Sequence, residues 1–169
     1  KDMFDDNFHR DFVIAARDRC DYTIDRIRTV VTPRYKYIRN FMTDRPYMQP
    51  NYRSEWETMR LLQQMYADGE LNEIQSRFPS DERPAEELYD LWEDPHETNN
   101  LLHSPDPVHA TELAKLRDIL YRWILETDDK GRFPEPHEAL EAIIDRWGDA
   151  AVNKEYDYVR EKMKEKETD

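Results

Sequence analysis

Alternating apolar residues in the first quarter of the chain predict three β-strands. Residues 11–17 place apolar side chains on both sides of an extended segment, a pattern typical of a strand buried on both faces. Residues 24–31 and 35–39 are rich in β-branched and aromatic residues and flank Thr32-Pro33-Arg34-Tyr35, a turn with proline at its second position. We therefore expect the second and third strands to form an antiparallel hairpin.

Residues 87–101 predict a short strand that runs directly into a fixed turn. The residues that suit a half-buried strand are Leu88, Tyr89 and Leu91. Asp94-Pro95 should stop the strand, because proline lacks the amide donor that a ladder needs. The side chains of Asn99 and Asn100 can bond to the backbone and close a turn, which lets the leucines that follow dock.

Apolar residues at three- and four-residue steps predict a long helix after this turn. Asp106 is its expected N-cap and Pro107 its first helical residue. Its apolar stripe should cover one face of the sheet and consists of Leu113, Leu116, Leu120, Trp123 and Thr127.

Shorter helices are predicted on both sides of the long one. Ser54 and Glu57 form the pattern of a capping box that opens a helix ended by Gly69, and a short helix over 70–78 follows. Residues 41–53 read as an ordered loop. Two C-terminal helices should pack through Leu140, Ile143, Ile144, Trp147 and through Val152, Tyr156, Val159, Met163. The fold class is therefore α+β: a small antiparallel sheet of about four strands, packed by a long helix, with additional C-terminal helices.

Length and composition indicate a single domain without a membrane span. With 169 residues and 38% hydrophobic content, one domain with a modest core is expected. The chain begins with Lys1, contains no apolar run that would span a membrane and shows no signal-peptide pattern, so it reads as a soluble fragment or processed product. Cys20 is the single cysteine and excludes an internal disulfide.

The charge is strongly acidic but unevenly distributed. A net charge of -13 argues against nonspecific binding of nucleic acid. Residues 17–53 nevertheless hold nine basic and four acidic residues, a local balance of +5, so the rest of the chain carries -18. This asymmetry fits a region that faces an anion or an acidic partner, or arginines that pair with the chain's own acidic elements.

Several kinds of catalytic or metal site find no support in the sequence. Three glycines, each at an apparent turn or helix end, exclude a phosphate-binding glycine loop. His103 and His109 are separated by two prolines and make a poor zinc pair. The adjacent carboxylates at 5–6 and 128–129 follow no buried strand that would fix them around a cation. Cys20 has no evident base beside it, so we expect no catalytic centre and no metal site in this chain.

Several segments, taken in order, resemble the C-terminal subdomain of type I sulfatases, the formylglycine-dependent group, and in particular the branch that includes heparan N-sulfatase and related bacterial glycan sulfatases. The resemblance covers roughly residues 12–135. It rests on Ala-Arg-Asp-Arg at 16–19 with Asp21, on 27–30 and 34–40, on Arg-Pro-Tyr at 45–47, on 86–101, and on Trp123 through Asp128 to Gly131.

One family motif is absent from the chain. The family's nucleophile lies in a Cys/Ser-x-Pro/Ala-x-Arg motif, which Cys20-Asp21-Tyr22-Thr23 does not match. The resemblance therefore implies that the catalytic machinery, including a calcium ion and the formylglycine, belongs to an N-terminal domain outside this chain. It implies a lead-in at 1–10, a sulfatase C-terminal subdomain at 11–131 and a helical extension at 132–169. By itself the chain would be inactive.

The resemblance also implies partners and a compartment. The subdomain would dock on the N-terminal sulfatase domain and form part of the wall of a pocket for a sulfated glycan, with no nucleic acid and no membrane as partners. A periplasmic, secreted or lysosomal location is expected. If it is produced alone, its docking face should be exposed and favour self-association.

Three arginines are the candidate substrate-binding residues. Arg17, Arg19 and Arg28 lie in the basic region beside the first strand and hairpin, and the arginine fork suits sulfate or carboxylate. The alternative is that they form ion pairs between domains. At the level of function, a noncatalytic interaction domain and the same subdomain in a phosphonate or phosphate-ester hydrolase of the wider superfamily stay open.

Overall fold

The computed structural model describes residues 9–168. The expected lead-in at 1–10 and the carboxylate pair at 5–6 therefore lie wholly or mostly outside the described residues. The chain forms two compact units. We call residues 9–16, 27–41 and 84–129 the sheet unit, and residues 17–26, 42–83 and 130–168 the cavity unit. The predicted domain boundaries at 10, 131 and 132 stay predictions.

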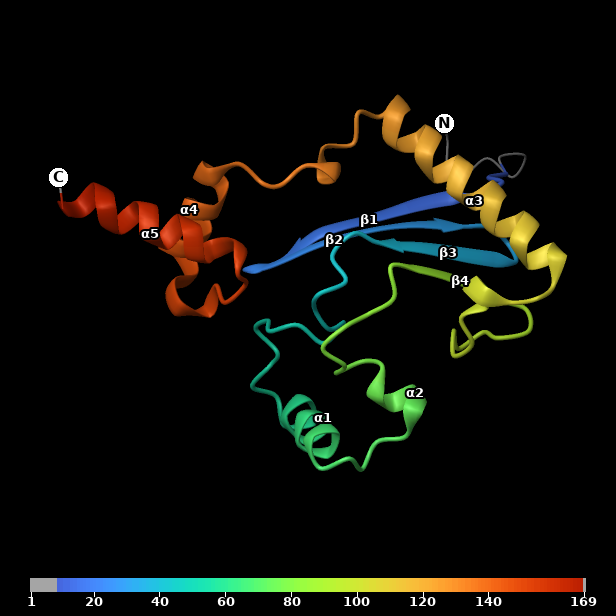
Figure 1. The fold of residues 1–169 in the computed structure, drawn as a ribbon, viewed down its shortest axis with the longest axis horizontal. Coiled ribbons are helices and arrows are strands. Elements are labelled where there is room, and N and C mark those ends of the chain that lie inside the picture. The colour runs from blue at the N-terminus through green and yellow to red at the C-terminus, as the bar shows by residue number, and fades with distance from the viewer. Residues whose placement is uncertain (1–8, 169) are drawn as a thin grey trace. The chain divides into compact units, whose positions relative to one another are not determined.

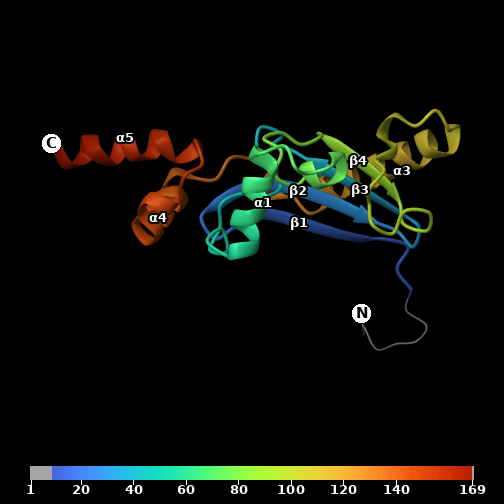
Figure 2. The same cartoon turned by 90° about the horizontal axis from the view of Figure 1, so that it is seen from below.

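Four strands form one sheet in the order β1-β2-β3-β4 (Figures 1 and 2). They are β1 (Val13–Cys20), β2 (Thr23–Val31), β3 (Tyr35–Asn40) and β4 (Glu86–Asp90). β2 pairs antiparallel with β3, and β3 with β4. The predicted hairpin is confirmed, and its turn is closed by the Thr32 amide, which donates to the Tyr35 carbonyl at 2.9 Å. The predicted α+β class is confirmed as well.

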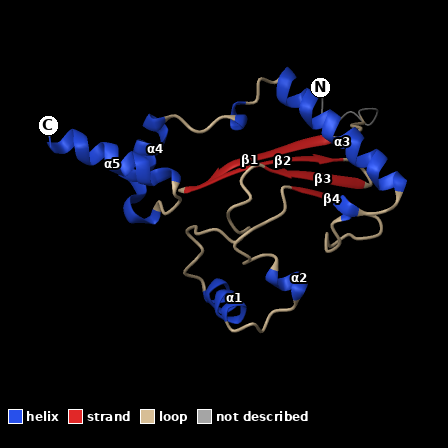
Figure 3. Ribbon diagram, in the orientation of Figure 1, coloured by secondary structure: helices blue, strands red, loops and turns tan. Residues whose placement is uncertain are grey.

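The long helix α3 (Pro107–Glu126) packs on the sheet and supplies the core of the sheet unit (Figure 3). The buried residues of this core are Val30, Tyr35, Tyr37, Leu88, Leu113, Leu116 and Leu120. The helix begins as the sequence predicts: the Asp106 side chain accepts a hydrogen bond from the Val108 amide at 2.8 Å. Each fully buried aliphatic side chain stabilises the fold by about 1.5–3 kcal/mol, so this stripe fixes the helix on the sheet.

The turn after β4 is held by side chains of the predicted residues. The Asp94 carboxylate accepts hydrogen bonds from the Asn99 amide at 2.8 Å and from the Thr98 hydroxyl at 3.0 Å. The Asn100 side-chain oxygen accepts from the amides of Leu88 and Leu102, both at 3.0 Å. One asparagine thus ties the strand to the short 3-10 helix at Leu101–His103, which confirms the predicted turn.

The cavity unit contains the remaining helices, which are α1 (Glu57–Ala67), α2 (Glu73–Ser76), α4 (His137–Trp147) and α5 (Glu155–Thr168), with short 3-10 segments at Lys130–Arg132 and Gly148–Ala150. Its buried core consists of Tyr22, Ile24, Met42, Leu140, Ala151, Tyr156 and Val159. The Tyr156 hydroxyl donates to the Tyr22 carbonyl at 2.6 Å, which fastens α5 to the start of β2. Within residues 9–168, no helix combines the length and the hydrophobicity needed to cross a bilayer.

Several details of the sequence prediction are wrong. Leu91 lies in the turn after β4, Thr127 is the exposed C-cap of α3 and not part of its buried stripe, and the helix predicted over 70–78 is only the four-residue α2. β1 is an edge strand with five of its eight residues exposed, because an edge strand has a neighbour on one side only, and it is not buried on both faces. α1 begins at Glu57 after Trp56, and the Ser54 hydroxyl accepts from the Asn51 amide instead of capping the helix. Val152 precedes α5 and is exposed, so it does not belong to the buried stripe.

Candidate functional site

A cavity of about 780 Å³ lies within the cavity unit. It is lined by residues of β1 and β2, by Met42 of the loop after β3, by the segment 130–136 and by single residues of α4 and α5. These residues are Asp18, Arg19, Ile24, Asp25, Arg26, Met42, Lys130, Gly131, Phe133, Pro134, Glu135, Pro136, Leu140 and Glu155. The lining combines an apolar floor with three cationic and four acidic side chains. A volume of this size suits a small ligand or a segment of a larger one.

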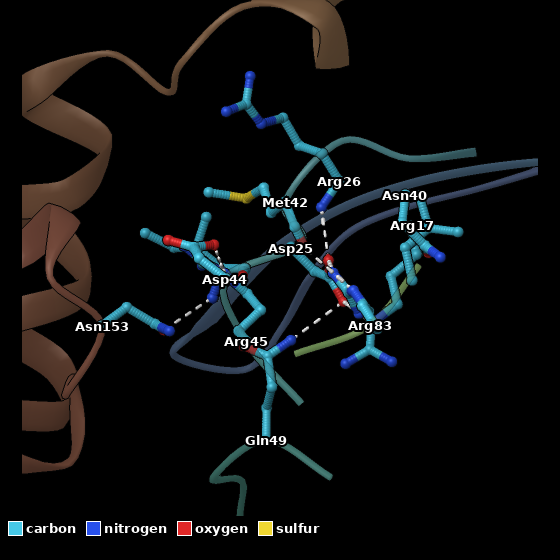
Figure 4. A network of polar contacts seen from close by, with 12 residues as sticks. Arg17, Asp25, Arg26, Asn40, Met42, Asp44, Arg45, Gln49, Arg83 and Asn153 are labelled. Carbon is cyan, nitrogen blue, oxygen red and sulfur yellow. Dashed lines mark hydrogen bonds and ion pairs between the residues drawn. The ribbon is translucent and has the colours of Figure 1, made fainter. Parts of the chain in front are cut away.

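Asp25 lies at the centre of a buried polar network (Figure 4). Asp25 and Arg83 are both fully buried and form an ion pair in which the carboxylate accepts both terminal nitrogens of the guanidinium. The same carboxylate accepts from Gln49 Nε2 at 3.1 Å and from the Arg26 amide at 2.8 Å. Arg83 Nε donates to the Met42 carbonyl at 2.9 Å. The network joins β2 to the segments around residues 42, 49 and 83 and fixes one wall of the cavity.

A second charged group lies beside the cavity at the start of α5. The Arg45 guanidinium is buried and donates to Glu155 at 2.7 Å and to the Ile24 carbonyl at 2.9 Å. It also pairs with Asp44, and Lys154 reaches the same carboxylate. Hydrogen bonds from Arg45 and Lys154 hold the pKa of Asp44 well below its usual range. These contacts keep Asp44 and Glu155 occupied by cations of the chain itself.

Of the three arginines predicted from the sequence, Arg17 and Arg19 belong to the cavity unit and Arg28 belongs to the sheet unit. Arg19 lines the cavity and pairs with Glu135. Arg17 lies on the same strand with Nε 3.7 Å from Asp25. Arg28 belongs to the sheet unit, is 1% exposed, and donates to both carboxylate oxygens of Asp129 at 2.8 and 2.9 Å. Asp129, one of the two adjacent carboxylates at 128–129, is therefore the partner of a buried arginine.

The basic region as a whole is largely neutralised by the chain. Six of its nine cations pair with carboxylates, namely Arg17, Arg19, Arg28, Arg34, Lys36 and Arg45. Among the described residues, the other three, Arg26, Arg39 and Arg53, have no carboxylate partner. Arg26 lines the large cavity, and Arg53 lines a smaller pocket. Neither arginine could be singled out from the sequence, since pairing depends on residues far away in the chain.

The groups that the family resemblance implies do not fit the residues present. In the part of the chain that the structure describes, no group of three or more His, Cys, Asp and Glu residues could hold a metal ion. Cys20 is a half-buried free thiol and lacks the motif of a formylglycine precursor. No catalytic step is therefore assigned to this chain.

Comparison with known proteins finds a sequence similarity to one sulfatase. No protein-family model matches it. Its sequence is 39% identical over 130 residues to the ulvan-active sulfatase of Formosa agariphila, a match that covers 76% of this chain and 22% of that enzyme. The chain thus spans about a fifth of the length of the curated relative it matches. This match supports the predicted resemblance to sulfatases, and it does not confirm the heparan N-sulfatase branch.

Two solved structures show a limited similarity to the chain. One is a 2-O GAG sulfatase, with a TM-score of 0.43, 22% identity, and coverage of 76% of this chain and 19% of that chain. The other is a protein of Bacteroides thetaiotaomicron assigned as a sulfatase, with a TM-score of 0.45 and the same identity and coverage. Because both TM-scores lie below 0.5, these structures carry no functional conclusion.

Proposed function

We propose that this chain is the C-terminal subdomain of a formylglycine-dependent sulfatase that removes sulfate from a glycan. The observation that supports it is the 39% identity over 130 residues to an ulvan-active sulfatase. The match extends over three quarters of this chain but about a fifth of that enzyme, which fits an accessory region whose catalytic centre lies elsewhere. In this proposal the chain contributes substrate contacts and domain packing, and the calcium ion and the formylglycine belong to the rest of the enzyme.

The proposed substrate contacts come from the basic region. Arg19 lines the large cavity, where Arg26 adds a cation without a carboxylate partner in the described residues. An arginine fork donates two parallel hydrogen bonds to sulfate or carboxylate, so both residues suit an anionic sugar. Arg17 is proposed as a further contact. Arg28 is the weakest of the three proposed contacts, since its buried guanidinium is bound to both carboxylate oxygens of Asp129.

The substrate and the compartment are proposed by analogy. Ulvan is the substrate named for the relative, and sulfated glycans of the heparan type are the substrate class of the branch that the sequence resembles. Both are polyanions that arginines can recognise. An exported location, periplasmic, secreted or lysosomal, is proposed because the substrates of such enzymes lie outside the cytoplasm.

A substrate panel on the full-length protein tests this proposal. Ulvan, heparin, chondroitin sulfate and a phosphate ester are incubated with the protein, and released sulfate and phosphate are quantified by ion chromatography. We expect sulfate from at least one glycan. Arg19→Ala should raise KM for that glycan, whereas Arg122→Ala, which removes an exposed arginine on α3, should not.

Other results would point to the alternatives. Release of phosphate without sulfate would favour the phosphate-ester hydrolase. If the full-length sequence lacks a Cys/Ser-x-Pro/Ala-x-Arg motif and neither anion is released, the sulfatase proposal is wrong and the noncatalytic interaction domain is favoured.

A further inference from the structure

A second, smaller pocket of about 300 Å³ lies within the cavity unit. It is formed by the end of β1, by the loop at residues 47–54, by one face of α1 and by Phe78 directly after α2. Its lining is unlike that of the large cavity, since it combines aromatic rings, side-chain amides and arginines. The residues with these functional groups are Tyr47, Tyr52, Phe78, Gln49, Asn51, Gln63, Arg17 and Arg53.

Arg53 presents an unneutralised cation at this pocket. Its guanidinium lies 4.8 Å from the centroid of the Tyr52 ring and 5.3 Å from that of the Trp56 ring. Both rings are more than half exposed, at 53% and 56%. In the described part of the chain no carboxylate pairs with it. Contact with two rings restricts the side chain while leaving its donors available to an anion.

A buried acceptor in the pocket wall also lacks a partner. Gln49 is 3% exposed, and its Nε2 donates to Asp25 at 3.1 Å, which orients the amide group. Its Oε1 is buried without a hydrogen-bond partner among the described residues. An unsatisfied buried carbonyl costs about 1–3 kcal/mol, so the bond to Asp25 and the packing of the pocket wall must outweigh that cost to hold Gln49 in place.

The loop that carries these groups is held in one conformation by its own hydrogen bonds. The Asn51 side chain donates to the Gln49 carbonyl at 2.9 Å and accepts from the Arg53 amide at 2.8 Å. The Thr23 hydroxyl donates to the Pro50 carbonyl, and the Met48 amide donates to the Phe78 carbonyl at 3.0 Å. The pocket is therefore preorganised, which lowers the entropy lost on binding.

We propose that this pocket is a saccharide subsite that binds one anionic sugar residue of a glycan chain. The exposed Tyr52 ring offers the face that Arg53 does not cover to the C–H groups of a pyranose, and Arg53 binds a sulfate or carboxylate substituent. The volume lies at the lower end of ligand pockets and suits a single ring. This inference rests on the proposed function, since it names the residues that would bind a second part of the same substrate.

Direct binding to the full-length protein tests the subsite independently of catalysis. Tetrasaccharides of ulvan and of heparin are titrated by calorimetry into the wild type and into the variants Arg53→Gln and Tyr52→Ala. We expect at least one tetrasaccharide to bind, and each variant to weaken that binding about tenfold. The matched control is Arg60→Gln, which removes an exposed arginine of α1 outside the pocket and should change Kd less than twofold. Both altered side chains are exposed, so circular dichroism should show an unchanged fold.

Two further probes establish the class of ligand. Cellotetraose, which is neutral, should bind at least tenfold more weakly than the charged tetrasaccharide, and poly-glutamate should not distinguish the wild type from Tyr52→Ala. If both variants bind the tetrasaccharides within twofold of the wild type, or if poly-glutamate shows the same losses, the subsite inference is overturned. If the protein releases sulfate but the variants bind as the wild type does, the subsite inference alone is refuted and the hydrolase proposal stands. Variant-sensitive binding without sulfate release would refute only the hydrolase proposal.

Discussion

Asp25→Asn should lower the free energy of unfolding strongly although it hardly changes the shape of the side chain. The variant keeps the volume of the side chain but removes the negative charge that faces Arg83. Both side chains of the pair are fully buried, so water cannot replace the lost partner. The guanidinium of Arg83 would then remain as an uncompensated charge beside the Gln49 amide and the Met42 carbonyl.

The magnitude follows from the burial of the pair. Breaking one partner of a buried ion pair costs about 3–5 kcal/mol, whereas total stabilities of domains are about 5–15 kcal/mol. With a urea m-value of about 2 kcal/mol per molar, the midpoint of unfolding should fall by about 1.5–2.5 M. The double variant Asp25→Leu with Arg83→Met should recover much of this loss, because apolar residues of similar size often replace buried pairs at little cost.

Urea unfolding of the 169-residue chain, followed by circular dichroism, measures this effect. Asp118→Asn is the matched control: it removes the same charge from an exposed arginine pair on α3 and should cost less than about 1 kcal/mol. A midpoint shift below about 0.5 M for Asp25→Asn, or a double variant less stable than the single one, would refute the view that the unpaired Arg83 charge dominates.

Further predictions concern the sheet unit. Arg28→Lys should lower the free energy of unfolding by about 2–4 kcal/mol, since an ammonium cannot bind both oxygens of Asp129, and denaturant titration checks this. Hydrogen bonds from Arg34 lower the pKa of Asp90, so the stabilisation by this pair should be present above about pH 4 and fall as the pH drops below that value. The difference in stability between the wild type and Asp90→Asn, measured from pH 7 to 2, should therefore shrink in acid. A constant difference would contradict this prediction. Asp106→Ala should cost about 1 kcal/mol through loss of the α3 cap, and an unchanged midpoint of thermal unfolding would count against that role. Light scattering of the chain produced alone should show self-association, and a monomer would argue against an exposed docking face.

Much of the fold was predictable because its signals are local in sequence. The turn at Pro33, the cap at Asp106 and the apolar stripe of α3 each act within a few residues, and all are confirmed except Thr127, the last residue of the predicted stripe. The prediction failed where a local pattern competed with distant structure. Ser54 fits a capping box by spacing, but its hydroxyl accepts a hydrogen bond from the Asn51 amide in the loop before α1, and the helix begins later, at Glu57.

The site was less predictable because charges are paired across long sequence separations. Arg28 and Asp129 are 101 positions apart, and Arg19 and Glu135 are 116 apart. A cluster of arginines in the sequence therefore could not reveal which cations the chain would neutralise. In the structure, Arg26 and Arg53 line the two pockets, although neither was chosen as a candidate from the sequence.

The sequence by itself determined the α+β class, the hairpin, the long helix and the likeness to sulfatases, since these depend on periodicity, turn chemistry and the order of short motifs. Only the tertiary structure decided that β1 is an exposed edge, that Asp25 and Arg83 share a buried network, and that Arg53 faces a pocket between aromatic rings. The physical reason is that burial and charge compensation are properties of groups brought together by folding, and no segment of the chain encodes them alone.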